Sequence, residues 1–172
     1  VSPVVDDHGG TVATATTVTV GSTTPGNIQF TGDVDVLKFT GMAGTAYNVG
    51  CTTSTSYLCV VRIRDSAGNL LNSPSYGTSI TVTFGASAAE VYSIELSAYY
   101  SSYTGTYSVS VSSVVDDHGG TVATATALTL GSAAAGNIQF AGDIDVFKFT
   151  ATAGTLYTVS CTTSGYYLCI IS

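Results

Sequence analysis

Short runs of alternating apolar and polar residues follow one another along this chain, separated by Gly, Asn, Asp and Ser. Alternation with a period of two, rich in β-branched and aromatic residues, is typical of strands that bury one face. No segment shows a sustained apolar period of 3.6 residues, and Thr11–Thr16 fits either a short helical turn or an extended segment. The strands expected in the first part of the chain are Thr17–Val20, Asn27–Thr31, Val34–Thr40, Tyr47–Thr52, Tyr57–Arg64, Ser79–Phe84, Val91–Ala98 and Thr106–Ser112. The pattern predicts an all-β fold, an antiparallel β-sandwich of the jelly-roll or immunoglobulin-like kind.

The first part of this pattern occurs twice. Val4–Val61 is repeated as Val114–Ile171 with an offset of 110 residues, and about 40 of the 58 aligned positions are identical. This period is too long for a solenoid unit and matches a whole domain. We therefore expect tandem β-sandwich repeats of about 110 residues. Residues 1–3 would end a preceding repeat, 4–113 would form a complete repeat, and 114–172 would be the first half of a second repeat.

A half-repeat of this kind would leave an open apolar sheet face and unpaired strand edges. Two interpretations follow. The chain is a window on a longer polypeptide, which we favour, or it is a subunit whose incomplete half is completed by strand addition from a neighbouring chain. In both cases the expected partners are other copies of the same unit, in adjacent repeats or neighbouring chains.

The composition narrows the range of functions. Only 9% of the residues are charged, and the net charge is −7. A chain so low in charge and so rich in apolar residues does not have the composition of a disordered protein. Its basic residues are too few for a surface that follows a phosphate backbone, so nucleic-acid binding is not expected; they are Lys38, Arg62, Arg64 and Lys148. No apolar run approaches the length of a membrane span, so we expect no membrane insertion.

The cysteines occur as Cys51 with Cys59 and as Cys161 with Cys169, at the same spacing in both copies. Two strands joined by a short polar turn would bring each pair together, and a disulfide across so small a loop would stabilise the fold by roughly 2–3 kcal/mol. Zinc is the alternative, but a zinc site usually requires two close cysteine pairs or added histidines. We favour disulfides, which indicate an oxidising, extracellular setting.

Two acidic motifs recur in each copy, Asp-Asp-His-Gly-Gly near the start and Gly-Asp-x-Asp before a strand. Carboxylate oxygens with nearby backbone carbonyls suit Ca²⁺, which takes 6–8 oxygen ligands. A divalent cation would also offset the repulsion between clustered carboxylates. The alternative is turn chemistry, in which Asp side chains accept hydrogen bonds from nearby backbone groups. The candidate calcium ligands are Asp6, Asp7, Asp33 and Asp35 in the first copy and Asp116, Asp117, Asp143 and Asp145 in the second.

These motifs resemble those of the bacterial pre-peptidase C-terminal domain family. The resemblance includes Asp6–Thr11, Gly26–Ile28, Gly32–Phe39, Ile63–Leu70 and the closing Gly105–Val111, and it covers the first copy and the part of the second that is present. It implies a secreted β-sandwich that is appended to peptidases or repeated in large bacterial surface proteins. It also implies calcium binding, because related collagen-binding domains of bacterial collagenases bind calcium through acidic residues that match the candidate ligands. Many family members have Glu-Pro-Asn-Asp where this chain has Asp-Asp-His-Gly, which leaves the roles of Asp7 and His8 open.

No catalytic constellation is found in the sequence. The histidines, His8 and His118, are one repeated position beside acidic turns, where local hydrogen bonding is the expected role. No Gly-x-Ser-x-Gly elbow occurs, and Glu90 and Glu95 form no acid–base pair. We therefore expect that the protein is not an enzyme.

A tyrosine-rich stretch near the end of the first copy is the remaining candidate. Tyrosines interleaved with Ser, Thr and Gly are typical of adaptable binding surfaces, and exposed tyrosines contact the ligand in the collagen-binding domains that the chain resembles. The alternative, which we favour, is a tyrosine-capped hairpin or a contact between repeats. The candidate ligand-binding residues are Tyr99, Tyr100, Tyr103 and Tyr107.

Together these features favour an extracellular structural repeat protein. Its β-sandwich units, stabilised by calcium and disulfides, would build a fibre, filament or adhesin stalk at a bacterial cell surface. The alternative is an accessory module of a secreted hydrolase that binds polysaccharide or collagen through its tyrosines.

Overall fold

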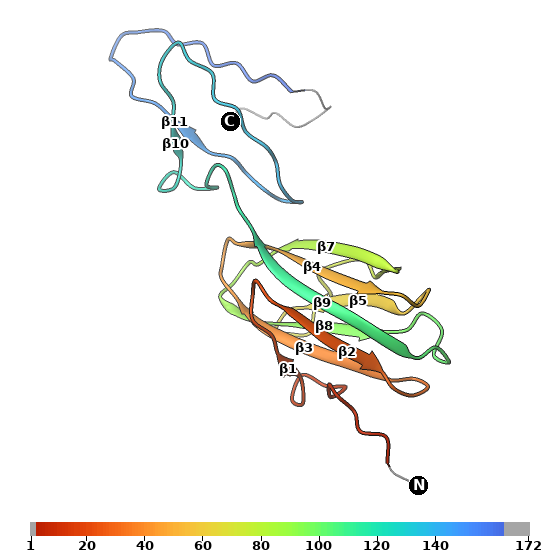
Figure 1. The fold of residues 1–172 in the computed structure, drawn as a ribbon. Helices are drawn as coiled ribbons and strands as arrows, with labels where there is room; N and C mark the ends of the chain where they lie inside the picture. The colour runs from red at the N-terminus through yellow and green to blue at the C-terminus, as the bar shows by residue number, and fades with distance from the viewer. Residues whose placement is uncertain (1–2, 164–172) are drawn as a thin grey trace. The chain divides into compact units, whose positions relative to one another are not determined.

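The computed structural model describes residues 3–163 and divides into two compact units, Val1–Val115 (unit 1) and Asp116–Ser172 (unit 2). Unit 1 is built from two sheets that lie one over the other (Figure 1). One sheet has the strand order β1-β3-β8-β5-β6 and the other has the order β2-β9-β4-β7. All the strand pairs of unit 1 are antiparallel except β1 with β3, so the predicted antiparallel β-sandwich is confirmed for unit 1. No helix among the described residues has the length and apolar character to cross a membrane.

The strands of unit 1 follow the predicted segments closely in the middle of the chain and less closely at its start. They are β1 Thr16–Thr17, β2 Thr23–Ile28, β3 Val34–Gly41, β4 Ala46–Thr53, β5 Cys59–Arg64, β6 Ser75–Gly77, β7 Ser79–Gly85, β8 Glu90–Ser97 and β9 Gly105–Val114. Within Thr11–Thr16, the first four residues form a turn closed by the Thr14 N–H, which donates to the Thr11 carbonyl at 3.0 Å, and Thr16 begins the short β1.

Two predicted strand boundaries are wrong for physical reasons. The predicted strand Asn27–Thr31 is β2, which begins at Thr23 and includes Pro25. β2 lies at the edge of its sheet, where a residue without an N–H is tolerated. The predicted strand from Tyr57 begins only at Cys59, because Tyr57 has a φ of 64° and belongs to the preceding turn. The pattern also missed β6, which is only three residues long.

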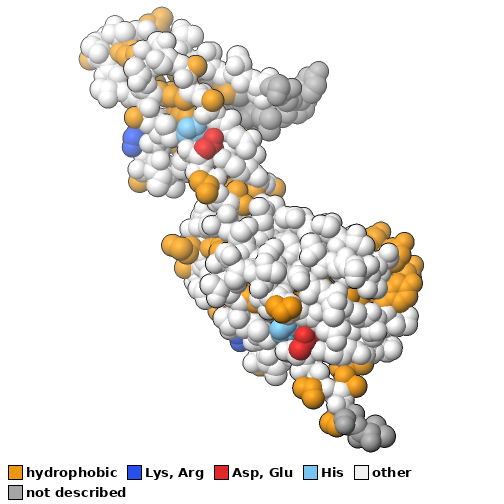
Figure 2. Space-filling model, in the orientation of Figure 1, with side chains coloured by type: hydrophobic (Ala, Val, Ile, Leu, Met, Phe, Trp, Pro, Cys, Tyr) orange, Lys and Arg blue, Asp and Glu red, His pale blue; other side chains and the backbone are white. Residues whose placement is uncertain are grey.

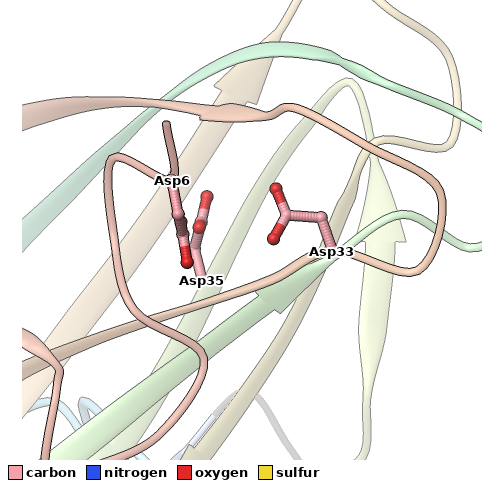
Figure 3. A group of neighbouring side chains, drawn as sticks. All are labelled: Asp6, Asp33 and Asp35. Atoms are coloured by element: carbon pink, nitrogen blue, oxygen red, sulfur yellow. The ribbon is translucent and has the colours of Figure 1, made fainter. Parts of the chain in front are cut away.

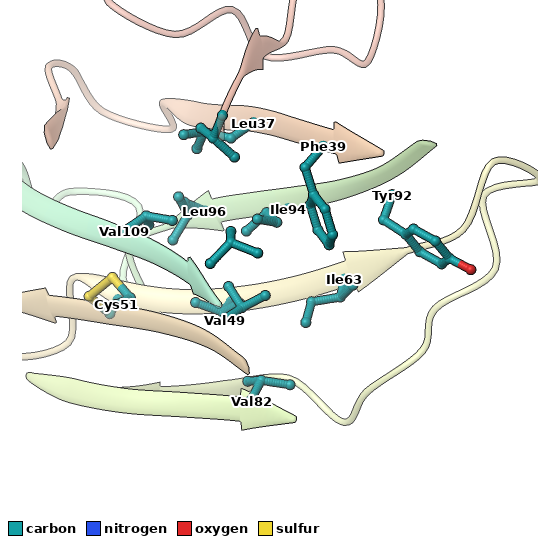
Figure 4. Packing of buried hydrophobic residues seen from close by; sticks show 14 of the residues in the cluster. Leu37, Phe39, Val49, Cys51, Ile63, Val82, Tyr92, Ile94, Leu96 and Val109 are labelled. Atoms are coloured by element: carbon teal, nitrogen blue, oxygen red, sulfur yellow. A yellow bond between two sulfur atoms is a disulfide. The ribbon is translucent and has the colours of Figure 1, made fainter. Parts of the chain in front are cut away.

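The core of unit 1 lies between the two sheets (Figure 4). Inward-facing residues alternate with polar ones along β4, β7 and β9, as period-two patterning requires. Four aromatic rings pack at one end, with centroids 5.0–6.3 Å apart; they belong to Phe39, Tyr47, Phe84 and Tyr92. Aliphatic residues fill the rest, including Leu37, Val49, Ile63, Val82, Ile94, Leu96 and Val109.

A disulfide links the two sheets at one edge of this core. Cys51 lies in β4 and Cys59 in β5, which belong to different sheets, and both are fully buried. Their sulfur atoms are bonded, with Cα atoms 6.0 Å apart. The predicted pairing of these two cysteines is therefore present, and the zinc alternative does not apply to them. The predicted pairing of Cys161 with Cys169 includes a residue that lies outside the described part of the chain.

Unit 2 repeats the first strand pair of unit 1. Its short strands β10 (Thr126–Ala127) and β11 (Phe147–Lys148) pair in parallel, as β1 pairs with β3. Positions that are core in unit 1 are exposed in unit 2. Leu156 is 96% exposed, whereas the matching Ala46 is 2% exposed, and Val159 is 53% exposed, whereas the matching Val49 is fully buried. In unit 1 such positions are covered by β7, β8 and β9, whose counterparts are not among the described residues of unit 2.

Candidate functional site

The acidic motifs of unit 1 are brought together by the segment before β1 and by the start of β3. Asp33 and Asp35 flank Val34, the first residue of β3. The segment that contains Asp6 is held against this strand, because the Val36 N–H donates to the Gly9 carbonyl at 3.2 Å. The His8 N–H donates to Asp6 Oδ1 at 3.2 Å, which fixes the carboxylate of Asp6 within its turn.

Three of the four candidate carboxylates meet. Asp6, Asp33 and Asp35 each offer an oxygen within 4.8 Å of the others, so one cation could contact all three. Figure 3 shows the carboxylates of Asp6 and Asp35 side by side, with that of Asp33 facing them. Asp6 is exposed, whereas Asp33 is 5% exposed and Asp35 is fully buried. The site is therefore open on one side and buried on the other.

Asp35 is the least solvated member of the cluster. Its Oδ2 accepts a hydrogen bond of 2.6 Å from the Tyr107 hydroxyl, while its Oδ1 is buried and has no hydrogen-bond partner. Burial, with a smaller contribution from the nearby charges of Asp33 and Asp7, raises the pKa of Asp35 to about 7, against the lowering effect of the Tyr107 hydrogen bond. Burial also raises the pKa of Tyr107, so its hydroxyl remains a donor.

A glycine makes this contact possible. Tyr107 lies in β9, next to Gly26 of the edge strand β2, and the two residues are register partners. A Cβ atom at Gly26 would lie 2.2 Å from Tyr107 Cζ, which is too close for any side chain. The Tyr107 ring therefore occupies the space that a side chain at Gly26 would fill, and from there its hydroxyl reaches Asp35.

His8 supports the site without offering it a ligand atom. Its Nε2 lies 2.9 Å from the Pro25 carbonyl and its Nδ1 lies 2.8 Å from Thr16 Oγ1. A carbonyl can only accept, so Nε2 carries a proton and is not available to a metal. The same two contacts recur at His118, with Ala135 and Thr126. These contacts give His8 the local hydrogen bonding expected from the sequence.

Gln29 also lies beside the site, although the sequence motifs did not single it out. Its backbone N–H donates to Asp33 Oδ2 at 2.7 Å, and its side-chain Nε2 donates to Asp7 Oδ1. Its Oε1 is buried and has no hydrogen-bond partner among the described residues. The repetition of this residue as Gln139 was the signal that could have identified it.

Asp7 is not part of the close group in unit 1, where its carboxylate holds Gln29 and lies 3.8 Å from His8 Nε2. In unit 2 the close group consists of Asp116, Asp117 and Asp145, and Asp143 is the residue outside it.

The second acidic cluster repeats the local bonds of the first. Gln139 N–H donates to Asp143 Oδ2 at 2.8 Å, and Gln139 Nε2 donates to Asp117. Asp145 Oδ1 is buried without a partner, as is Asp35 Oδ1 in unit 1. Burial raises the pKa of Asp145, followed by the charges of Asp117 and Asp143.

The second candidate surface consists of five tyrosines from three parts of unit 1, here called the tyrosine cluster. Their ring centroids are 4.7–6.4 Å apart, and each residue is 40–53% exposed. Figure 2 shows a hydrophobic patch at the right-hand end of unit 1, where the β8–β9 connection lies in Figure 1. A shallow depression beside Tyr103 is lined by Thr55, Ser56, Ser102 and Thr104. The cluster contains the predicted Tyr99, Tyr100 and Tyr103, together with Tyr57 and Tyr76.

Tyr107 does not belong to this surface. It is only 4% exposed, because its position in β9 points toward the core and the acidic cluster. Its predicted role in ligand binding therefore does not fit the structure, because its hydroxyl donates a hydrogen bond to Asp35.

No family model and no curated protein matches the chain. Solved structures similar to it include the following two. One is the pre-peptidase C-terminal domain of a collagenase from Bacillus anthracis, with 15% identity and a TM-score of 0.46 over 56% of this chain and 92% of that domain. The other is PliG of Aeromonas hydrophila, a periplasmic inhibitor of g-type lysozyme, with 15% identity and a TM-score of 0.48 over 58% of this chain and 95% of the inhibitor. The first is a domain of the family that the sequence motifs resemble.

Proposed function

We propose that the protein is a non-catalytic, extracellular structural module whose β-sandwich units bind calcium and assemble in series, as in a surface fibre or adhesin stalk. The observation that carries calcium binding is the fully buried Asp35, whose Oδ1 has no partner although two further carboxylates converge on it. A buried carboxylate oxygen left without a partner is costly unless the group is protonated or bound to a cation.

The donor set fits calcium by its chemistry. Asp6, Asp33 and Asp35 offer carboxylate oxygens that lie within 4.8 Å of one another, and the unpartnered amide oxygen of Gln29 is a further candidate ligand. Hard oxygen ligands with several negative charges and open access on one side suit Ca²⁺, which completes its shell with water. The bound ion would fix the segment before β1 against β3. The disulfide between Cys51 and Cys59 supports an oxidising compartment.

A thermal melt of the full chain, with calcium and with excess chelator, tests calcium binding. At a hundredfold excess over the dissociation constant, calcium should stabilise the folded state by about 2.7 kcal/mol. Asp33→Asn, which keeps the shape of the side chain, should reduce the calcium-dependent rise in melting temperature of unit 1. Glu90→Gln is the matched control, because Glu90 is an acidic residue outside the close acidic groups, and it should respond as the wild type does. Identical melting curves with calcium and with chelator would contradict the proposal.

The tyrosine cluster favours a second candidate function, an accessory module that binds an extracellular polymer such as a polysaccharide or collagen. Five half-exposed rings and a rim of hydroxyl groups offer stacking faces and hydrogen bonds at little entropic cost.

Pull-down on insoluble polysaccharides and on collagen tests this second function. We expect Tyr100→Ala combined with Tyr103→Ala to abolish retention on whichever polymer the wild type binds. Met42→Ala is the control, because Met42 is also exposed but lies outside the tyrosine cluster. No retention of the wild type on any polymer, or equal retention of the tyrosine variant, would rule out this function for the cluster.

A further inference from the structure

The two long sheet edges of unit 1 differ in how they are protected. In the sheet β2-β9-β4-β7, the edge strands are β2 and β7. β2 contains Pro25, which has no N–H, and its outer side is occupied because the His8 imidazole donates to the Pro25 carbonyl at 2.9 Å. Proline and covering groups are devices that keep an edge from pairing with another chain.

β7 has none of these devices. It runs for seven residues, Ser79-Ile80-Thr81-Val82-Thr83-Phe84-Gly85, with no proline and no charge. Its ladder with β4 is one-to-one from Ser79 to Gly85, so no bulge interrupts it. Among the described residues, β7 pairs with β4 alone, which leaves its other edge unpaired. The edge strands of the other sheet, β1 and β6, are only two and three residues long.

The sheet to which β7 belongs is also free of charge. Its four strands contain no Asp, Glu, Lys or Arg, whereas β3, β5 and β8 of the other sheet carry charged residues. Figure 2 shows the face over β2, β9 and β4 almost free of charged side chains, apart from acidic and basic side chains at its margin. Two copies can therefore approach along this sheet without like-charge repulsion, despite the net charge of −7.

The sequence of β7 is complementary to itself. If two β7 strands pair antiparallel about a twofold axis at Val82, Thr81 of one copy lies opposite Thr83 of the other, and Ile80 lies opposite Phe84. Thr81 and Thr83 are exposed on the outer face, while Val82 and Phe84 face the core. Threonine pairs and aromatic–aliphatic pairs are the cross-strand combinations that stabilise sheets. A twofold axis makes the contact isologous and closed.

We propose that β7 is the assembly edge of the unit and that its partner is β7 of a second copy, paired antiparallel to form one continuous eight-stranded sheet. In an array of units, this contact joins two chains side by side. The inference rests on the proposed structural role, but its test is run in chelator, so the failure of calcium binding and the failure of this contact are distinguishable.

Charge-swap variants of the full chain test the pairing and its register. Thr81→Asp with Thr83→Asp places like charges directly opposite each other across the twofold axis, and Thr81→Lys with Thr83→Lys does the same with positive charge. Each double variant should raise the dimer dissociation constant, measured by light scattering and sedimentation, by about tenfold or more. A mixture of the two should form a one-to-one heterodimer, because Asp then faces Lys.

Thr52→Asp with Ser112→Asp is the matched control, since these exposed residues lie in the inner strands β4 and β9 of the same sheet and are not register partners. This control should dimerise as the wild type does, and melting curves should show that all variants are folded. A wild type that stays monomeric at millimolar concentration, or an aspartate double variant that associates as strongly as the wild type, would overturn the proposal. If the wild type instead associated through the exposed apolar positions of unit 2, the aspartate double variant would still associate as strongly as the wild type.

Discussion

Asp35→Asn should make the calcium-free protein more stable at pH 8 than the wild type, and it should also remove the calcium response of unit 1. An unfolded Asp releases its proton near pH 4, whereas Asp35 in the folded state keeps its proton up to about pH 7. Between these values the folded state binds more protons than the unfolded state, so the free energy of unfolding decreases as the pH rises. This decrease in the free energy of unfolding can reach about 4 kcal/mol.

The asparagine removes this dependence, because it carries no charge at any pH. Its amide oxygen can still accept from the Tyr107 hydroxyl, and its N–H groups can donate to the neighbouring carboxylates of Asp6 and Asp33. The calcium-free variant should therefore lose much less stability between pH 5 and pH 8 than the wild type. Some slope remains, since the pKa of Asp145 is also raised by burial.

Urea denaturation in chelator at pH 5, 6, 7 and 8 checks this prediction. Asp65→Asn is the control, because Asp65 is a partly exposed turn residue whose pKa is lowered by its hydrogen bonds with Asn69. The stability that ionised Asp65 contributes is lost only as the pH falls below this range. The free energy of unfolding of this variant should therefore change between pH 5 and pH 8 as that of the wild type does. If the wild type were equally stable at pH 5 and pH 8, burial would not raise the pKa of Asp35 as inferred.

The sequence was most informative where the pattern was local. The alternating residues of β4, β7 and β9 predicted strands with one buried face, and the spacing of Cys51 and Cys59 predicted their disulfide. The edge strand β2 was harder to predict, because Thr23 to Gly26 contains proline and glycine and no inward aliphatic residue. Its pairing is set by β9, about 80 residues away in the sequence.

The sequence predicted which residues form the acidic cluster, but it did not predict their contacts. Repetition of the motifs identified Asp6, Asp33 and Asp35 as candidates, and the structure brings them together. The partnership of Asp35 with Tyr107 could not be seen, because it depends on a contact between the two sheets and on the space left by Gly26. The same contact explains why Tyr107 is buried while the neighbouring tyrosines in the sequence are exposed.

Tyr107→Phe should destabilise the calcium-free protein at pH 8 by about 3 kcal/mol. It removes the hydrogen bond that Asp35 Oδ2 accepts, and Asp35 Oδ1 has no partner within the described part of the chain. Hydrogen bonds to a charged acceptor are stronger than those between neutral groups, and a buried carboxylate left without partners adds its desolvation cost. The loss should be smaller at pH 5, where Asp35 is protonated in the folded state.

Tyr92→Phe is the matched control for this change. Tyr92 is fully buried, and its hydroxyl donates to a neutral acceptor, the Ala88 carbonyl, at 3.1 Å. Its loss should be about 1 kcal/mol and independent of pH. In the Asp35→Asn background, Tyr107→Phe should also cost only about 1 kcal/mol, since its acceptor is then neutral. Equal losses for Tyr107→Phe in both backgrounds, measured by urea denaturation in chelator, would show that the hydroxyl supports core packing and not the charge of Asp35. A coupling of about 2 kcal/mol would instead show that the Tyr107 hydroxyl stabilises the ionised carboxylate of Asp35 inside the sandwich.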